Sequence, residues 1–265
     1  MALTFSHPAV SLPFKKLGLA PCALIVGSII PDFEFFLRMT PQRLVGHTAI
    51  GILTFCLPVG FGVLLLYHTI LKQPLISLMP REHRKRLLSA ARSYPFFRIR
   101  RIWNIFISLT IGILTHIGWD AFTHADGWFV LHISPLQLSL LEIPGIGVVR
   151  MYFALHYLTS AAGLFMLIHW YQRWATGSGI SFLGSLRNLG KLFGRIHAVT
   201  GLATGALAGG TIYGMIMIVP SIGIEPMKHF ISQSAIAGVT FFLAGIVLFS
   251  IVWHLTGARK SMECS

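Results

Sequence analysis

The chain has 265 residues, of which 54% are hydrophobic and only 11% are charged. Soluble domains carry about 25% charged residues, so this composition excludes an ordinary soluble protein and indicates an integral membrane protein. A net charge of +13 would suggest nucleic-acid binding in a soluble chain, but no recognition motif accompanies the charge, and we expect no nucleic-acid partner.

The first apolar segments are short and contain prolines. Ser6 and Pro8 are typical of a helix start, and the segment ends at Pro13. A second apolar segment, residues 17–37, is interrupted by Pro31. The sequence is compatible here with either a spanning helix or a helical hairpin.

Five later segments are apolar and long enough to cross a bilayer at about 1.5 Å per residue. They are residues 45–71, 103–122, 151–171, 198–219 and 231–255. No polar linker divides the chain, so we expect one all-α integral membrane domain over residues 1–265, a polytopic transmembrane helical bundle of five to six spans. Residues 1–171 are expected to form the core that carries a metal site, and residues 198–255 the last two spans.

Basic residues gather in alternate connections between the expected spans. Residues 72–101 form a basic, amphipathic segment, and further basic residues lie in 172–197 and at the C-terminal end, whereas the glycine- and proline-containing loop 123–150 has few. By the positive-inside rule, the basic segments are cytoplasmic and contact anionic lipid headgroups there, with 72–101 as an interfacial or soluble helix. The loop 123–150 then faces outward.

The most unusual stretch is 115–126, Thr-His-Ile-Gly-Trp-Asp-Ala-Phe-Thr-His-Ala-Asp. His116, Asp120 and His124 are four residues apart, which places them on one face of a helix, with adjacent Cβ atoms about 5–6 Å apart. A carboxylate in a membrane segment costs on the order of 3 kcal/mol or more unless it is paired or coordinates an ion. We therefore interpret His116 and Asp120 as metal ligands, with pairing between helices as the alternative.

The expected topology brings other residues of ligand type to the same depth. His47 begins one span and His156 another, Asp32 joins them if 17–37 crosses outward, and His7 joins them if the first segment folds back. Imidazole and carboxylate groups are ligands for zinc and similar divalent metals. The candidate ligands are His7, Asp32, His47, His116, Asp120 and His156, and the candidates for a proton shuttle or for orienting a ligand are Asp126, His124 and Glu34.

Four motifs resemble those of a known family. They are Thr-Phe-Ser-His-Pro at 4–8, Gly-Ser-Ile-Ile-Pro-Asp-Phe-Glu at 27–34, Gly-His-Thr at 46–48 and Thr-His-Ile-Gly-Trp-Asp-Ala-Phe-Thr-His-Ala-Asp-Gly at 115–127. The combination resembles DUF4184, a family of uncharacterised bacterial membrane proteins. The order of residues is also similar to YdjM-type membrane-bound metal-dependent hydrolases and, more distantly, to zinc-dependent phospholipase C and the S1/P1 nuclease group. The resemblance implies five ligands: His7, Asp32, His47, His116 and Asp120.

These observations predict a multi-pass protein of the bacterial cytoplasmic (inner) membrane with a metal site toward the outer face. The expected activity is metal-dependent hydrolysis of a phosphoester or other ester of a lipid or envelope substrate, with a divalent metal, zinc being the first choice over manganese or iron. The alternatives are a non-catalytic metal-binding protein, an ion or proton relay, and an assembly factor whose polar cluster locks the helices. The sequence does not define the oligomeric state.

Overall fold

A computed structural model of the chain describes residues 4–79, 83–84, 86–87, 96, 98–143, 147–176, 196–217 and 224–256. Among these residues, five helical stretches are long and apolar enough to cross a membrane. They are Ala49–Leu78, Ile99–His132, Met151–Trp174, Val199–Ile216 and Pro226–Leu255. The expected all-α, polytopic fold is thereby confirmed. Lys72–Leu78 extends the first span and Ile99 begins the second, so both ends of the basic segment 72–101 belong to spans. Residues 80–82, 85, 88–95 and 97 of this segment, and residues 177–195 of the segment 172–197, lie outside the described residues.

The chain divides into two compact units. The first comprises Met1–Phe33, Leu44–Phe61 and Phe97–Tyr171, and the second Glu34–Arg43, Gly62–Phe96 and Gln172–Ser265. All six candidate metal ligands fall in the first unit, so its internal packing determines how they meet. The single domain that we expected over residues 1–265 stays a prediction.

The N-terminal segment forms a series of short helices and not a span. These are η1 (Thr4–Ser6), α1 (Pro8–Ser11), η2 (Leu12–Leu17), α2 (Pro21–Gly27), η3 (Ile30–Asp32) and α3 (Phe33–Arg38). Prolines occupy the first-turn positions of several of them, where no amide hydrogen is needed. The longest of the six, α2, has 7 residues, far short of the roughly 20 that cross a bilayer. Of the two arrangements compatible with the sequence, the segment therefore adopts the folded-back one.

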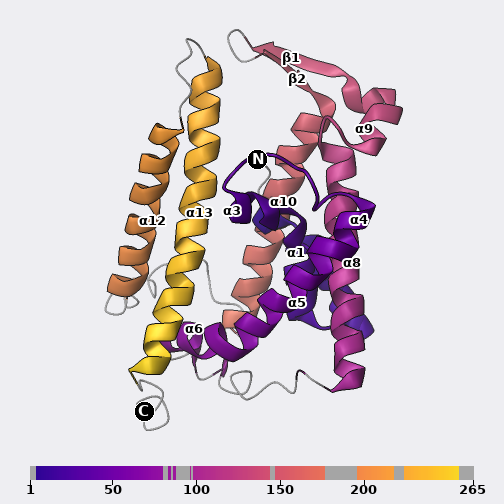
Figure 1. The fold of residues 1–265 in the computed structure, drawn as a ribbon. Coiled ribbons are helices and arrows are strands. Elements are labelled where there is room, and N and C mark those ends of the chain that lie inside the picture. Colours follow the sequence, from indigo (N-terminus) through magenta and orange to yellow (C-terminus); the bar gives the residue numbers. More distant parts are fainter. Residues whose placement is uncertain are drawn as a thin grey trace. The chain divides into compact units, whose positions relative to one another are not determined.

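Helix α8 (Ile99–Thr123), labelled in Figure 1, belongs to the first unit, and α2 packs closely on it. A Cβ atom at Gly112 would lie 2.5 Å from the carbonyl oxygen of Leu24, and one at Gly27 would lie 2.4 Å from that of Leu109. Only glycine at both positions permits this approach. The contact brings Ser28, just after α2, beside the turn of α8 that carries His116.

The first span consists of α4 (Ala49–Gly51), the π-helical turn η4 (Ile52–Cys56), α5 (Leu57–Leu66), a second π-helical turn η5 (Tyr67–Leu71) and α6 (Lys72–Leu78). The Thr48 hydroxyl accepts a hydrogen bond from the Gly51 amide at 2.9 Å, which caps the N-terminus of α4. Just before this cap, a Cβ atom at Gly46 would lie 2.3 Å from the Pro31 carbonyl oxygen. This close approach places His47 next to Asp32.

The segment between the second and third spans is more ordered than the loop that we expected. It contains α9 (Trp128–His132), η6 (Ser134–Gln137) and an antiparallel hairpin of β1 (Ser139–Ile143) and β2 (Gly147–Arg150), in which Leu141 pairs with Val149. Of the glycines and prolines that suggested a loop, Gly127 precedes α9, Pro135 lies in the first turn of η6, and Gly147 begins β2 with a φ of +106° that favours glycine. Helix α10 (Met151–Thr176) follows directly.

In the second unit, α12 (Ile196–Ile216) and α13 (Ile224–Leu255) pack along each other (Figure 1). The Thr240 hydroxyl on α13 donates to the Phe36 carbonyl at 3.0 Å, and His254 Nε2 donates to the Ile70 carbonyl at 3.0 Å. These contacts connect α13 to α3 and η5 within this unit.

Candidate metal centre

Four side chains of ligand type converge in the first unit from three different segments. His116 and Asp120 lie one turn apart near the C-terminal end of α8, Asp32 ends η3, and His47 precedes the Thr48 cap of the first span. One ligand atom from each of the four lies within 4.8 Å of the other three. The structure thus brings together two residues that the i, i+4 spacing predicted and two that only the fold could place beside them.

The distances among these atoms are nearly uniform. His47 Nε2 lies 3.2 Å from His116 Nε2. His47 Nε2 is 3.5 Å from Asp32 Oδ1 and 3.4 Å from Asp120 Oδ2, and His116 Nε2 is 3.5 Å from each of the same two oxygens. Five of the six separations are therefore 3.2–3.5 Å, and the sixth, between the ligand oxygens of the two carboxylates, is at most 4.8 Å.

These separations fit a tetrahedral site for a small divalent ion. Zinc binds histidine nitrogen and carboxylate oxygen at about 2.0–2.2 Å, which places the ligands of a regular tetrahedron about 3.3–3.6 Å apart. The observed range of 3.2–3.5 Å agrees with that spacing. A donor set of two imidazoles and two carboxylates also suits a borderline metal better than a soft one.

Two contacts around the cluster orient its ligands. His116 Nδ1 donates a hydrogen bond to the Ser28 carbonyl at 2.8 Å, so in the neutral ring Nε2 carries the lone pair that faces the other three ligands. The Thr4 hydroxyl donates to Asp32 Oδ2 at 2.6 Å, which leaves Oδ1 to face the cluster. Partners of this kind commonly fix the orientation of metal ligands. Neither partner is recognisable from the sequence: Thr4 stands out only as part of the Thr-Phe-Ser-His-Pro motif, and a carbonyl partner has no sequence signal.

The cluster is shielded from solvent, which makes its charge costly unless it is balanced. Asp32 is 2% exposed, Asp120 3% and His116 0%. Burial by itself raises the pKa of the Asp32 carboxyl, but His116 and the Thr4 hydroxyl outweigh this effect and hold that pKa at about 2, so the carboxylate is ionised. A lone pair of His116 facing two carboxylates is stable only if a cation or a proton lies among them. Asp32 Oδ1 has no hydrogen-bond partner among the described residues, as expected of an atom reserved for an ion.

Asp120 also contacts histidines outside the four-residue group. Its Oδ1 lies 3.7 Å from His7 Nε2 and 3.3 Å from His124 Nδ1. The His7 ring stacks on His116, with centroids 4.1 Å apart. Burial, followed by the nearby His116, lowers the pKa of His7 to about 3, so its imidazole is neutral at physiological pH. His7 thus lies beside the four ligands, as the folded-back N-terminal segment requires.

The remaining candidates occupy different surroundings. The buried ring of His156, on α10, packs edge-on against His124 at a centroid distance of 4.9 Å, outside the four-residue group. Asp126 lies in the exposed turn after α8. Glu34 is buried at the start of α3 and belongs to the second unit.

The fold and the cluster define a multi-pass membrane protein with a buried His/Asp group that fits a divalent ion. Comparison with known families adds one match: the domain of unknown function DUF4184 matches residues 1–251. The chain therefore belongs to the DUF4184 family, as its motifs predicted. No curated protein and no solved structure matched the chain.

Proposed function

We propose that this protein is a membrane-embedded, metal-dependent hydrolase that acts on a phosphoester or other ester of a lipid or envelope molecule. The observation that supports this proposal is the convergence of ligand atoms from the buried Asp32, His116 and Asp120 and the half-buried His47, with each histidine nitrogen 3.2–3.5 Å from the other three atoms. The ion proposed for them is divalent, with zinc the first choice.

A divalent ion held by these residues would act as a Lewis acid, and since four protein ligands complete a tetrahedron, the water whose pKa it lowers would have to enter as a fifth ligand. The chain supplies the remaining functions. The two carboxylates would balance the charge of the ion, and the Ser28 carbonyl and the Thr4 hydroxyl hold His116 and Asp32 in orientation. Because Asp32, His116 and Asp120 are buried, these electrostatic interactions are stronger than they would be at a wet surface.

His124 is proposed as the group that moves a proton. Its Nδ1 lies 3.3 Å from Asp120 Oδ1 and 3.3 Å from the Thr123 hydroxyl. Its side chain is 20% exposed, so one end of the imidazole contacts the cluster while the ring stays accessible. Asp126 and Glu34 remain candidates for the same role or for supporting a ligand.

We place the site toward the outer face of a bacterial cytoplasmic membrane. Helix α8 follows Arg98 and carries Arg100 and Arg101 in its first turn, whereas His116 and Asp120 lie near its other end. Basic residues at a span terminus favour the cytoplasmic side, where they would meet anionic headgroups. The cluster then lies at the opposite end of the span.

A second candidate function is an ion or proton relay. Asp120, His124 and His156 form a continuous series of contacts that leads away from the four ligands. Buried ionisable residues in such a series are typical of proton pathways in membranes. Proton or metal uptake into proteoliposomes that is abolished by His156→Ala, with no hydrolytic activity detectable, would favour this candidate.

The test of the metal site is elemental analysis of the protein purified in detergent, next to Asp120→Ala and His116→Ala. We expect about one metal ion per chain, or more, in the native protein and its loss in both variants. The matched control is His132→Ala, an exposed histidine at the end of the same span, which should retain the metal. X-ray absorption should then show nitrogen and oxygen ligands at about 2.0–2.2 Å and no sulfur.

If properly folded native protein binds no metal even after zinc is supplied, the proposed function is wrong. If metal is present, phospholipids and model phosphodiesters are tested as substrates with and without a chelator. Hydrolysis that requires the metal and is lost in both variants is the expected result.

A further inference from the structure

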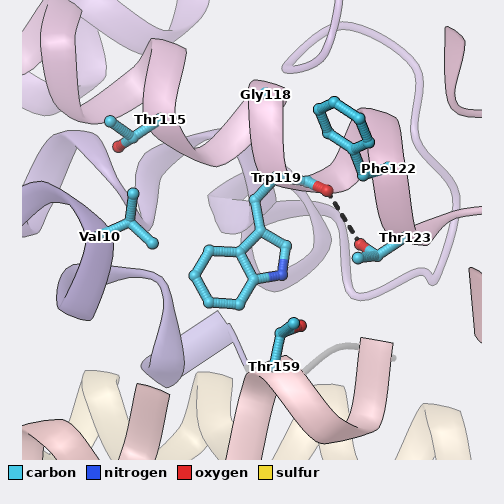
Figure 2. A pocket seen from close by; sticks show the side chains of 7 residues that line it. All are labelled: Val10, Thr115, Gly118, Trp119, Phe122, Thr123 and Thr159. Atoms are coloured by element: carbon cyan, nitrogen blue, oxygen red, sulfur yellow. Dashed lines mark hydrogen bonds between the residues drawn. The ribbon is translucent and has the colours of Figure 1, made fainter. Parts of the chain in front are cut away.

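An apolar pocket lies beside the metal centre, within the first unit. It has a volume of about 370 Å³ and is lined by residues of α1, α8 and α10, among them Val10, Trp119, Phe122 and Thr159. Figure 2 shows the Trp119 indole extending into the space between Val10 and Thr159. No charged side chain lines the pocket.

The pocket and the cluster share two turns of α8. Trp119 precedes the ligand Asp120 in sequence, and its indole lies 5.4 Å from the His7 ring, centroid to centroid. At the other end, the Thr123 hydroxyl lies 3.3 Å from His124 Nδ1. A molecule that fills the pocket therefore has one end next to the histidines around Asp120.

The pocket is also continuous with the surface that meets lipid. Its walls belong to two of the candidate membrane spans, Ile99–His132 and Met151–Trp174. Leu114 and Leu158, which precede the lining residues Thr115 and Thr159 in sequence, are 53% and 67% exposed. Exposed apolar residues on a spanning helix face the acyl chains of the bilayer. A lipid could therefore enter from the side without leaving the membrane.

We propose that this pocket binds an acyl chain of a membrane lipid and thereby presents the ester or phosphoester of that lipid to the metal centre. The inference rests on the proposed function and specifies its substrate class as an acylated lipid. With a methylene group taken as similar in size to a water molecule, about 30 Å³, the pocket accommodates roughly twelve carbons. Because the bilayer is as apolar as the pocket, packing in the pocket positions the lipid without contributing hydrophobic affinity.

The test uses protein in nanodiscs of dioleoylphosphatidylcholine that contain a small fraction of phosphatidylglycerol with a diazirine near the end of one acyl chain. After illumination, mass spectrometry maps the labelled residues. Wild type is compared with Gly118→Leu, which fills the pocket from α8, where a Cβ meets no atom within 4 Å. Thr159→Leu fills it independently from α10. Gly62→Leu is the matched control, since Gly62 also lies in a spanning helix with no atom within 4 Å of a Cβ.

We expect label to concentrate on Trp119 and Phe122 in the wild type and in the control. In both filled variants it should fall about tenfold, because the larger side chain occupies the space of the acyl chain. Label spread evenly over exposed residues such as Leu114 and Leu158, or unchanged in the filled variants, overturns the inference. So does absence of label from the pocket in the wild type, which would result if a protein partner occupied it.

Metal content of the same samples separates the two proposals. If zinc copurifies with all four proteins but the pocket residues are not labelled, the assignment of a lipid substrate is wrong and the proposed metal centre is retained. If the pocket is labelled in folded protein that binds no metal, the hydrolase proposal fails, and with it the assignment of a lipid substrate.

Discussion

Replacing Asp120 with asparagine separates the charge of this residue from its shape. The carboxylate oxygens of Asp120 lie 3.3–3.7 Å from nitrogens of four histidines: His7, His47, His116 and His124. Asparagine keeps the size and one carbonyl oxygen, but it removes a negative charge. The substitution should therefore have opposite effects on the metal-free and the metal-bound protein.

In the metal-free protein, Asp120 lies close to a second carboxylate. The ligand oxygens of Asp32 and Asp120 are within 4.8 Å of each other, and at an effective dielectric constant of about 20 two unit charges at that distance repel by about 3.5 kcal/mol. A proton on a neighbouring histidine offsets part of this cost. We expect Asp120→Asn to melt at an equal or higher temperature than the wild type when both are treated with chelator.

In the metal-bound protein, the same substitution removes a charged ligand. Loss of an outer partner alone typically weakens metal binding about 10–100-fold, so loss of Asp120 as a ligand should exceed about 100-fold. Zinc at about 100 times its dissociation constant stabilises the native state by about 2.7 kcal/mol. For a chain of this size that corresponds to a rise of about 5–11 °C in Tm. At the same concentration the variant should gain about 1 °C or less.

The assay is thermal unfolding in detergent, with chelator and with zinc. Glu142→Gln, which changes an exposed acidic residue of β1, is the control and should show the full response to zinc. An undiminished zinc shift in Asp120→Asn would show that this carboxylate is not a ligand. A large loss of stability in chelator would show that Asp120 is held by hydrogen bonds within the protein and not reserved for an ion.

Three further substitutions test the surroundings of the cluster. Gly112→Ala should lower the free energy of unfolding by about 1–3 kcal/mol and reduce metal content, because its Cβ meets α2, whereas Gly118→Ala, which faces open space, should not; thermal melting and elemental analysis check both. Thr4→Val removes the hydrogen bond to Asp32 and should weaken zinc binding about tenfold in a competition titration with a chelating dye. The buried His7, with its pKa lowered to about 3, stays neutral in the native state while the unfolded chain takes up a proton below about pH 6.5. Native stability is therefore lost as pH falls from about 6.5 to 3, by up to about 1.4 kcal/mol per unit; His7→Gln should flatten this part of the pH–Tm profile of chelated protein, and an unchanged profile would contradict the assignment.

The part of the cluster that the sequence predicts most directly is the pair of ligands on one helix. The i, i+4 relation of His116 and Asp120 is local, and the helix that the apolar pattern predicted places them together. Asp32 and His47 joined them only by way of topology, which followed from charge and length. The expected spans agree with the observed ones because apolar length is a strong signal in a membrane protein.

Other features depend on contacts that single-sequence patterns do not encode. The sequence was compatible with either a span or a fold-back for residues 17–37, and the close approach of Gly27 to α8 is a tertiary contact. The carbonyl of Ser28 that orients His116 is a backbone group, which every residue type provides, so the sequence does not mark it. The β1–β2 hairpin was interpreted as loop because its glycines and prolines dominate a short segment, and hairpins of this length have weak patterns.

The short N-terminal helices also bear on how the protein is made. α1 and α2 leave the ribosome well before α8, yet neither is long enough to be inserted as a span. Helix α8 is the helix on which α2 packs, and its Gly112 follows Gly27 by some 85 residues. Backbone of this kind is stable at membrane depth only when other helices cover it. The N-terminal segment must therefore dock after α8 has been inserted. An ion bound by Asp32, His116 and Asp120 would join this segment to α8 and stabilise the docked arrangement.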